Sequence, residues 1–222
     1  MPSLHIDFIS DISCPWCAIG LSSLQLAMAQ LAGEVDITLR CQPFELNPDM
    51  PPGGQDITEH LAHKYGSTPE QQAQMREVIR QRGAEVGFTF HPDGRGRIYN
   101  TFNAHRLLHW TAVAHAAQHV PFKQALLVAC HQHQQPMDEL STLLACVREA
   151  GLNEHEAREL LATDRYVDEV RLQQAFYADA GIRSVPAVVV NEQHLITGSQ
   201  SVAHYAAALR QIQSSALSSS HE

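Results

Sequence analysis

The sequence has no long hydrophobic run and few basic residues, and these shortages exclude several classes of protein. No apolar stretch approaches the roughly 20 residues that a membrane-spanning helix needs. The 15 Lys and Arg residues are scattered, and 24 Asp and Glu residues outnumber them to give a net charge of −9. A nucleic-acid-binding protein usually carries a basic patch or stripe. We therefore expect no nucleic acid and no membrane among the partners.

The features of a secreted protein are also missing. The apolar segment from Leu4 to Ser10 contains His5 and Asp7, and no basic segment precedes it, so we expect no signal peptide. The cysteine count of five is odd, which argues against a secreted scaffold held together by disulfides. We therefore expect a cytoplasmic protein, in which a CxxC pair is catalytic or metal-binding more often than structural.

The hydropathy pattern of the N-terminal region predicts a strand, a helix and a second strand. Residues 4–9 and 35–41 alternate apolar and polar side chains, as half-buried strands do. Between them, apolar residues recur at helical spacing from Leu21 to Leu31, and Gly33 supplies a stop. Because the strand, helix and second strand follow one another closely in the chain, they predict a βαβ unit with a right-handed crossover.

The middle of the chain predicts helices only. Residues 43–55 are rich in Pro and Gly and predict a linker that leaves the sheet. From residue 56 to about residue 180 strand character disappears and a helix-capping spacing recurs. The pairs with this spacing are Asp56 with Glu59, Ser67 with Glu70, and Asn153 with Glu156. The sequence therefore predicts a helical insertion about the size of a small domain.

Strand character returns near the C-terminus, in residues 186–191 and 194–197. A last helix is expected to open at Gly198-Ser199-Gln200. Since neither end of the chain can bury a core alone, both should join one sheet. The resulting division is an α/β domain of residues 1–50 and 181–213, a helical insertion of residues 51–180, and a flexible tail of residues 214–222.

The strongest chemical signal is Cys14-Pro15-Trp16-Cys17, which stands between the first strand and the first helix. Unpaired N–H groups and the helix dipole stabilise a thiolate at a helix start, so the pKa of Cys14 should fall. A thiolate is the form that attacks disulfides. Cys17 lies one turn further and can resolve the mixed disulfide, while Pro15 suits the first turn and Trp16 offers an apolar surface.

Two other roles for the pair remain open. A CxxC is half of a four-ligand zinc site, and Cys130-His131-Gln132-His133 offers further ligands, but no second CxxC completes a four-cysteine set. A pair of buried structural cysteines is the second alternative. The position at a helix start favours redox chemistry over both, and we predict no metal site.

The segment Ser184-Val185-Pro186 is the second signal. A trans proline is permitted at the first position of a strand. A cis bond before proline is uncommon, but it is retained where it serves a purpose. With a CxxC elsewhere in the chain, we favour the cis form.

These residues resemble a known family. The Cys14–Cys17 segment after a strand, the helical insertion, and Val185-Pro186 before a strand resemble the DsbA-like thioredoxin superfamily. Within it, residues 44–48 (FELNP) and 101–106 (TFNAHR) resemble the FrnE-type branch. The resemblance covers residues 4–212. It implies an α/β, thioredoxin-like fold with a large all-helical insertion.

The resemblance also implies a division of roles at the site. Cys14 would be the attacking thiol and Cys17 the resolving thiol. Pro186 would be cis and lie against the pair, and Val185 would offer its backbone to an extended substrate. The substrates would be disulfide-bearing proteins or small molecules.

Relatives on the same fold suggest an alternative function. Kappa-class glutathione transferases and 2-hydroxychromene-2-carboxylate isomerases typically carry Ser where Cys14 stands here, and they use glutathione. The paired cysteines favour redox chemistry. Ser199 and Gln200, at the expected start of the last helix, offer N–H groups for a carboxylate, so glutathione is our candidate co-substrate. A plain capping serine is the commoner role. We expect no tightly bound cofactor.

The remaining polar residues have ordinary interpretations. Two histidine pairs at i, i+4 spacing, His105 with His109 and His115 with His119, suit a metal but suit a polar helix face better. Cys41 is expected in the core. Cys130 and Cys146 lie on separate expected helices, and pairing between them is disfavoured.

Asp7 and Glu45 are candidate proton carriers, but nothing in the sequence places either near the thiols, so neither joins the predicted site. The sequence thus predicts a thiol–disulfide oxidoreductase, monomeric or homodimeric. The alternatives are a glutathione-dependent isomerase or transferase and a zinc-holding binding or chaperone module.

Overall fold

A four-stranded sheet carries both ends of the chain. The computed structural model describes residues 3–219, and the side chains of residues 3–215. The strands are β1 (Ser3–Ser10), β2 (Asp36–Pro43), β5 (Ala187–Val190) and β6 (His194–Thr197), in the order β2-β1-β5-β6. β1 is parallel to β2 and antiparallel to β5, and β5 is antiparallel to β6. The two ends of the sequence therefore join one sheet, as predicted.

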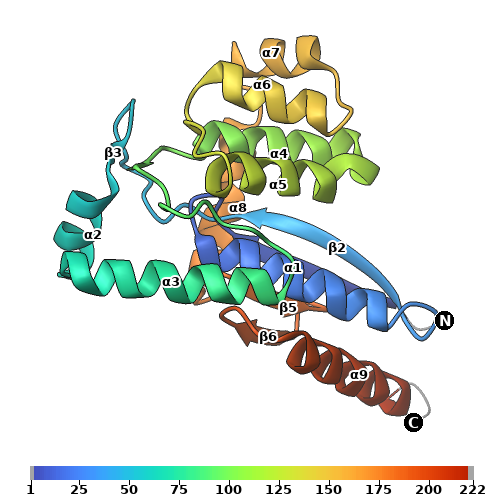
Figure 1. Cartoon of the computed structure of the whole chain (residues 1–222). Helices are drawn as coiled ribbons and strands as arrows, with labels where there is room; N and C mark the ends of the chain where they lie inside the picture. Colours follow the sequence, from blue (N-terminus) through green and yellow to red (C-terminus); the bar gives the residue numbers. More distant parts are fainter. Residues whose placement is uncertain (1–2, 220–222) are drawn as a thin grey trace.

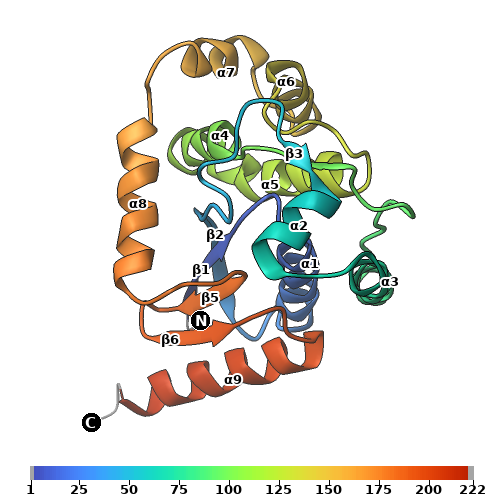
Figure 2. The same ribbon diagram turned by 90° about the vertical axis from the view of Figure 1, so that its left-hand side faces the viewer.

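Alternation along β1 divides the hydrophobic core between the two faces of the sheet. Leu4, Ile6 and Phe8 belong to the largest buried cluster, together with residues of α1 (Pro15–Gln30) and α9 (Val202–Ser219). Ile9 points to the opposite face, where Tyr177 of α8 (Val167–Asp179) packs. Helices thus lie on both faces of the sheet, with α1 and α9 on one and α8 on the other (Figures 1 and 2).

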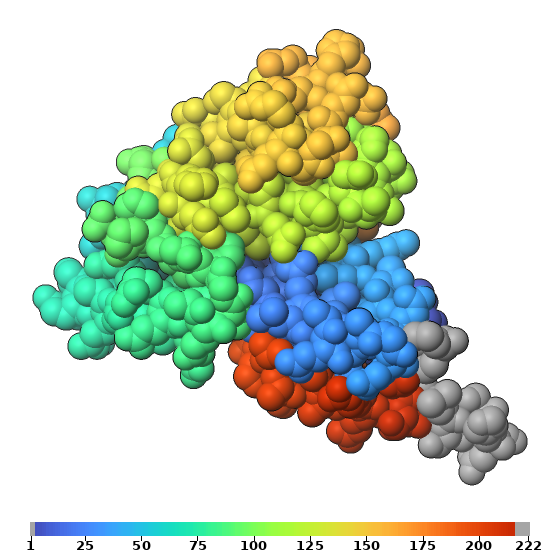
Figure 3. Space-filling view, turned by 45° about the vertical axis from the view of Figure 1, so that its right-hand side comes forward, coloured from blue at the N-terminus to red at the C-terminus, as the bar shows by residue number. Residues whose placement is uncertain are grey.

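The insertion is helical and forms a second core. Besides α8, which packs on the sheet, its helices are α2 (Ile57–Tyr65), α3 (Pro69–Glu85), α4 (Phe102–Ala114), α5 (Ala116–His131), α6 (Leu140–Glu149) and α7 (Glu154–Leu161). Apolar residues of α4 to α7 bury one another in this core. The insertion also covers the open edge of β2, because the Cys41 N–H donates to Nε2 of His119 at 2.9 Å. In space-filling view the insertion lies directly on the N-terminal part of the chain (Figure 3).

The middle of the chain is not free of strands, so that prediction was wrong. Two-residue strands β3 (Gln55–Asp56) and β4 (Arg97–Ile98) pair in antiparallel register. Strands this short carry no periodicity, and only the folded chain brings the two segments together. Arg97 fixes the pairing further, since its guanidinium donates to the carbonyls of Gly53 and Gly54.

Two of the three predicted helix caps are present. The side chains of Asp56 and Asn153 accept hydrogen bonds from the first N–H groups of α2 and α7. The third cap is one residue later than predicted: Thr68, rather than Ser67, forms the capping box with Gln71. Pro69 is then the first helical residue, where its missing N–H is harmless.

The last helix differs from prediction at both ends. It begins at Val202, and the Ser201 hydroxyl accepts from the His204 N–H at 3.2 Å, so Ser199 and Gln200 precede the helix rather than open it. It continues to Ser219, through residues expected in a flexible tail. Residues 220–222 of that tail lie outside the described residues. Within residues 3–219, no helix is long and apolar enough to cross a membrane.

Candidate active site

The two cysteines of the CxxC segment meet at the start of α1. Cys14 is the N-cap residue, with extended backbone angles (φ −91°, ψ 115°), and Pro15 begins the helix. The Cys14 N–H donates to the Asp11 carbonyl at 3.3 Å, and the Cys17 N–H donates to the Cys14 carbonyl at 3.1 Å. This turn directs both thiols to one side, where they interact with each other.

The pKa values of the two thiols are shifted in opposite directions. A hydrogen bond from Cys17 outweighs burial and lowers the pKa of Cys14, which is 4% exposed. Burial raises the pKa of Cys17, which is completely inaccessible, and the neighbouring Cys14 raises it further. Cys14 is therefore the more acidic and the less buried of the two thiols.

The Val185–Pro186 peptide bond is cis and faces the pair. The Cys14 Sγ lies 3.8 Å from the Val185 carbonyl oxygen. Pro186 packs on Gly20 of α1, where an added Cβ would stand 3.0 Å from the proline Cγ and 3.6 Å from the Ser199 hydroxyl. The lack of a side chain at Gly20 thus lets α1 approach this loop closely.

The side chains around Cys14 include one that the sequence did not indicate. Trp16 is partly exposed and packs against the main core. Tyr65, at the end of α2, is 62% exposed. Partial burial of its phenol raises the pKa of Tyr65, and the charge of Cys14 raises that pKa further. Of the two other predicted residues, Ser199 stays beside Pro186, while the Gln200 amide donates to the Thr197 carbonyl at 2.7 Å.

A buried carboxylate fixes the turn before Cys14. Asp11 is 1% exposed and accepts hydrogen bonds from the N–H and hydroxyl of Ser13 and from the N–H of Leu46, at 3.1, 2.8 and 2.7 Å. The Thr101 hydroxyl donates at 2.8 Å, and His105 Nε2 lies 3.6 Å away. Burial alone would raise the pKa of Asp11, but His105 and these N–H groups hold it well below its usual range.

Two more residues of the insertion bind the same turn. Arg95 donates to the Ser13 carbonyl at 2.7 Å and contacts the Cys130 Sγ at 3.3 Å. His131 Nε2 lies 2.9 Å from the Ile12 carbonyl, so it donates a hydrogen bond there. Burial lowers the pKa of His131 well below the usual range, which keeps the ring neutral. The insertion therefore holds every residue from Asp11 to Ser13 in place.

With this geometry established, comparison with known proteins identifies the family. A model described as the DSBA-like thioredoxin domain matches residues 5–210. The chain belongs to this family. No curated protein matches. As the resemblance implied, the fold is thioredoxin-like with a helical insertion, and the enzyme is a DsbA-like oxidoreductase.

Solved structures of similar fold superpose over most of the chain. A probable DsbA oxidoreductase from Streptomyces coelicolor is 28% identical, with 94% of this chain and 89% of that chain covered and a TM-score of 0.82. A 2-hydroxychromene-2-carboxylate isomerase is 14% identical (96% and 98% covered, TM-score 0.68). The cytosolic disulfide reductase DsbM from Pseudomonas aeruginosa, solved with GSH, is also 14% identical (93% and 98% covered, TM-score 0.63). The last two show the shared fold alone.

In this DSBA-like chain, the carboxylate beside the thiols is neither of the two considered from sequence. Asp7 accepts from the Gln42 amide at 2.6 Å, and Glu45 pairs with Arg171. Asp11 lies three residues before Cys14, a proximity visible in the sequence. Its burial depends on Thr101 and His105, which are about 90 residues away in the chain.

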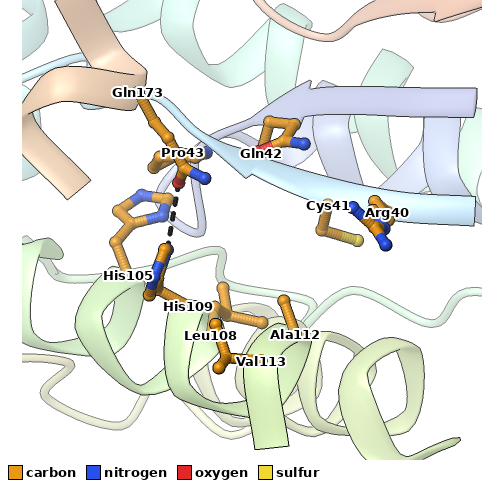
Figure 4. A pocket seen from close by; sticks show the side chains of 10 residues that line it. All are labelled: Arg40, Cys41, Gln42, Pro43, His105, Leu108, His109, Ala112, Val113 and Gln173. Atoms are coloured by element: carbon orange, nitrogen blue, oxygen red, sulfur yellow. Dashed lines mark hydrogen bonds between the residues drawn. The ribbon is translucent and has the colours of Figure 1, made fainter. Parts of the chain in front are cut away.

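The other predicted polar residues have structural roles. Within the described part of the chain, no group of three or more His, Cys, Asp or Glu side chains is arranged to hold a metal ion. His109 bonds to Gln173 at 3.2 Å, and the two line a cavity of about 110 Å³ between β2, α4 and α8 (Figure 4). Cys41 and His105 also line it, but Cys14 and Cys17 do not, so the cavity is separate from the CxxC pair.

Proposed function

We propose that this DSBA-like protein exchanges disulfides through Cys14 and Cys17. The Cys14 thiolate attacks one sulfur of a substrate disulfide, and the first substrate thiol leaves with a proton. Cys17 then attacks the Cys14 sulfur of the mixed disulfide. A Cys14–Cys17 disulfide forms, and the second substrate thiol is released. The substrate gains two electrons, and the pair loses two.

The single observation that carries this proposal is that the two thiols differ in both acidity and burial. The more acidic thiol, Cys14, is 4% exposed, and the less acidic thiol, Cys17, is completely buried. This is the order that a two-step exchange requires, because the more accessible thiol must react first and the fully buried thiol second. The opposite arrangement would leave the reactive sulfur inaccessible.

The surroundings of Cys14 favour an extended or small disulfide substrate. The Val185 carbonyl lies beside the sulfur, and an extended peptide could pair with this backbone. Trp16, two residues from Cys14 in the chain, and Tyr65, whose pKa the charge of Cys14 raises, supply partly exposed apolar surface. Disulfide-bearing proteins and small molecules are therefore the proposed substrates.

Glutathione is the proposed small-thiol partner, and the cytoplasm the proposed setting. The neighbour solved with GSH is a cytosolic disulfide reductase. Ser199 lies beside Pro186, where a bound thiol would reach Cys14. A cytosolic glutathione pool would keep a mildly oxidising pair reduced, which favours a reductase or isomerase role in the cell.

A redox titration in glutathione buffers tests the proposal. Trp16 fluorescence in a Trp110→Phe variant should report one reversible two-electron transition, which Cys14→Ser should abolish. Cys17→Ser should accumulate a mixed disulfide that mass spectrometry detects. Full turnover by Cys14→Ser would refute the proposal. Glutathione-dependent turnover that survives Cys17→Ser would instead indicate an isomerase or transferase.

A further inference from the structure

An arginine of the insertion contacts the residue next to Cys14. Arg95, in the segment between α3 and β4, donates through Nη2 to the Ser13 carbonyl at 2.7 Å. That carbonyl belongs to the Ser13–Cys14 peptide bond, so the guanidinium lies beside the backbone of Cys14. The other contact of the guanidinium is also with a neutral group, the Cys130 Sγ at 3.3 Å. Within residues 3–215, the charge of Arg95 therefore has no carboxylate bound to it.

The loop that carries Arg95 is fastened to the C-terminal end of α5. The His91 N–H donates to the His131 carbonyl at 3.0 Å. The Gln134 amide, just after α5, donates to the Gly94 carbonyl at 2.6 Å. These contacts fix the backbone immediately before Arg95, so the position of its guanidinium does not depend on the contact with the turn alone. A charged group held in this way is already in place when the reaction begins.

Asp11 binds the same residue as Arg95 does. The Asp11 carboxylate accepts from the N–H and the hydroxyl of Ser13, at 3.1 and 2.8 Å, while Arg95 binds the Ser13 carbonyl. A negative and a positive group thus hold the residue that precedes Cys14. The charge of Asp11 raises the pKa of Cys14. A cation bound to the same residue acts on the thiolate in the opposite sense, since it favours the charged form.

Other titratable groups surround this turn. They are Cys17 (α1), Lys64 and Tyr65 (α2), His105 (α4), and Cys130 and His131 (α5). Burial raises the pKa of Cys130 and lowers that of His131, so both are neutral. The ammonium of Lys64 donates to the Leu46 carbonyl at 2.6 Å. Asp93, in the same loop as Arg95, has a side chain that is 90% exposed. Arg95 is thus the cation that binds the peptide next to the attacking thiol.

We propose that Arg95 is a positioning residue for Cys14, which fixes the Ser13–Cys14 peptide through its carbonyl and balances the charge of Asp11 beside the attacking thiol. This role rests on the proposed function. Arg95 forms and breaks no covalent bond, and it keeps its proton throughout the exchange. It acts while the Cys14 thiolate attacks the substrate disulfide, so the loss of Arg95 should affect the first step of the reaction.

The rate at which the Cys14 mixed disulfide forms measures this first step. The dithiol protein is mixed rapidly with oxidised glutathione, quenched with acid and analysed by mass spectrometry. Arg95→Met should slow formation about fivefold near pH 5 but less than about twofold near pH 9, because losing a cation reduces the thiolate fraction only below the thiol pKa. A rate equal to the wild-type rate throughout this pH range would overturn the proposal. So would a rate reduced by the same factor at every pH, which is the result of a purely structural role.

Two further variants separate charge from shape. Arg95→Lys keeps the positive charge and a donor for the Ser13 carbonyl, so its rates should stay within about twofold of the wild-type rates. Arg97→Met is the matched control, because Arg97 also binds only carbonyls, those of Gly53 and Gly54, and its loss should leave the rates unchanged. An Arg95→Lys protein as slow as Arg95→Met would overturn the proposal. Failure of the wild-type protein to form any mixed disulfide would instead refute the proposed function, so the two failures are distinguishable.

A spectroscopic measurement on the wild-type protein covers the case in which Arg95→Met does not fold. In protein labelled with ¹⁵N at arginine, Arg95→Lys assigns the Nε resonance of Arg95. This resonance should shift with the same pH midpoint as the ultraviolet absorbance of the Cys14 thiolate, whereas the Arg97 resonance should not. An Arg95 resonance that does not respond to ionisation of Cys14 would overturn the proposal.

Discussion

At the scale of single residues, the site depends on one buried carboxylate. Asp11 accepts hydrogen bonds from Ser13, Leu46 and Thr101, and these contacts join β1, the segment after β2, and the insertion. The same carboxylate is close enough for its charge to raise the pKa of Cys14. Asp11 therefore fixes the shape of the turn and moderates the acidity of the thiol that the turn presents.

Replacement of Asp11 by Asn should separate these two effects. We expect Asp11→Asn to lose roughly 2–4 kcal/mol of unfolding free energy, because an amide cannot accept from all the donors that now face the carboxylate. The pKa of Cys14 should fall further when the nearby negative charge is gone. Urea unfolding and the ultraviolet absorbance of the thiolate measure the two quantities. The exposed Asp36→Asn variant should leave both unchanged.

Acid should affect the same residue in a definite direction. Folding lowers the pKa of Asp11, so its contribution to stability is complete above the unfolded value of about 3.9 and is lost as the pH falls below it. Wild-type protein should lose unfolding free energy between about pH 5 and pH 2, and Asp11→Asn should lose less. Parallel curves for the two proteins would contradict this expectation.

At the scale of elements, α5 closes the open edge of β2. His119 Nε2 accepts from the Cys41 N–H, and Nδ1 therefore carries the ring proton toward the Thr111 hydroxyl at 2.9 Å. An unpaired strand edge would expose backbone N–H groups to other chains, and this contact covers it. Burial in this position lowers the pKa of His119 to about 4.

The edge contact should weaken in mild acid. Because the folded pKa of His119 is lowered, the unfolded chain takes up a proton first, and stability falls from about pH 6.5 to about pH 4, by at most roughly 3 kcal/mol. His119→Gln can still accept from Cys41 without titrating, so it should flatten this part of the curve. Urea unfolding at pH 7.5 and pH 5 measures this loss of unfolding free energy. The exposed His194→Gln variant is the control and should behave as the wild-type protein does.

The approach of α1 to the cis-proline loop is a second element-scale feature. A side chain at Gly20 would meet Pro186 at 3.0 Å. We expect Gly20→Val to cost about 1–3 kcal/mol through overpacking and to slow disulfide exchange by moving the loop away from Cys14. Gly96→Val, where an added Cβ meets nothing within 4 Å, should leave the exchange rate unchanged. Stopped-flow reaction with a small disulfide measures it.

At the scale of the whole molecule, the insertion and the sheet share their hydrophobic packing. Leu127 of α5 is part of the core under the sheet, while Ile12 of the turn before Cys14 is part of the core of the insertion. Each core thus contains residues from the other part of the chain. The chain boundary predicted between the domains does not separate the two hydrophobic cores.

The two tryptophans report on the two parts separately. Trp16 lies in α1 and Trp110 is buried in the insertion. In Trp110→Phe and Trp16→Phe variants, the fluorescence midpoint in urea should coincide with the midpoint of that variant's own far-ultraviolet circular dichroism, because shared packing makes unfolding cooperative. Two separated transitions in either variant would show that the parts unfold independently.

The sequence by itself determined the strands of the sheet, their connections and the position of the CxxC pair at a helix start. Strands and helices have side-chain periods of 2 and 3.6 residues, and these local patterns are present before the chain folds. They include the alternation in residues 4–9 and 35–41 and the helical spacing after Cys14. The start of the last helix was predicted less well, because Gly198 to Ser201 all tolerate turns and caps and only the contact with His204 selects Ser201.

Tertiary structure decided what surrounds the thiols. Asp11 is a buried anchor because Thr101 and His105 come to it. Burial and electrostatic contact depend on distances between residues that are about 90 or more positions apart in the chain. No local pattern records such distances, since hydrophobic periodicity specifies which face of an element is buried but not which charge it meets there.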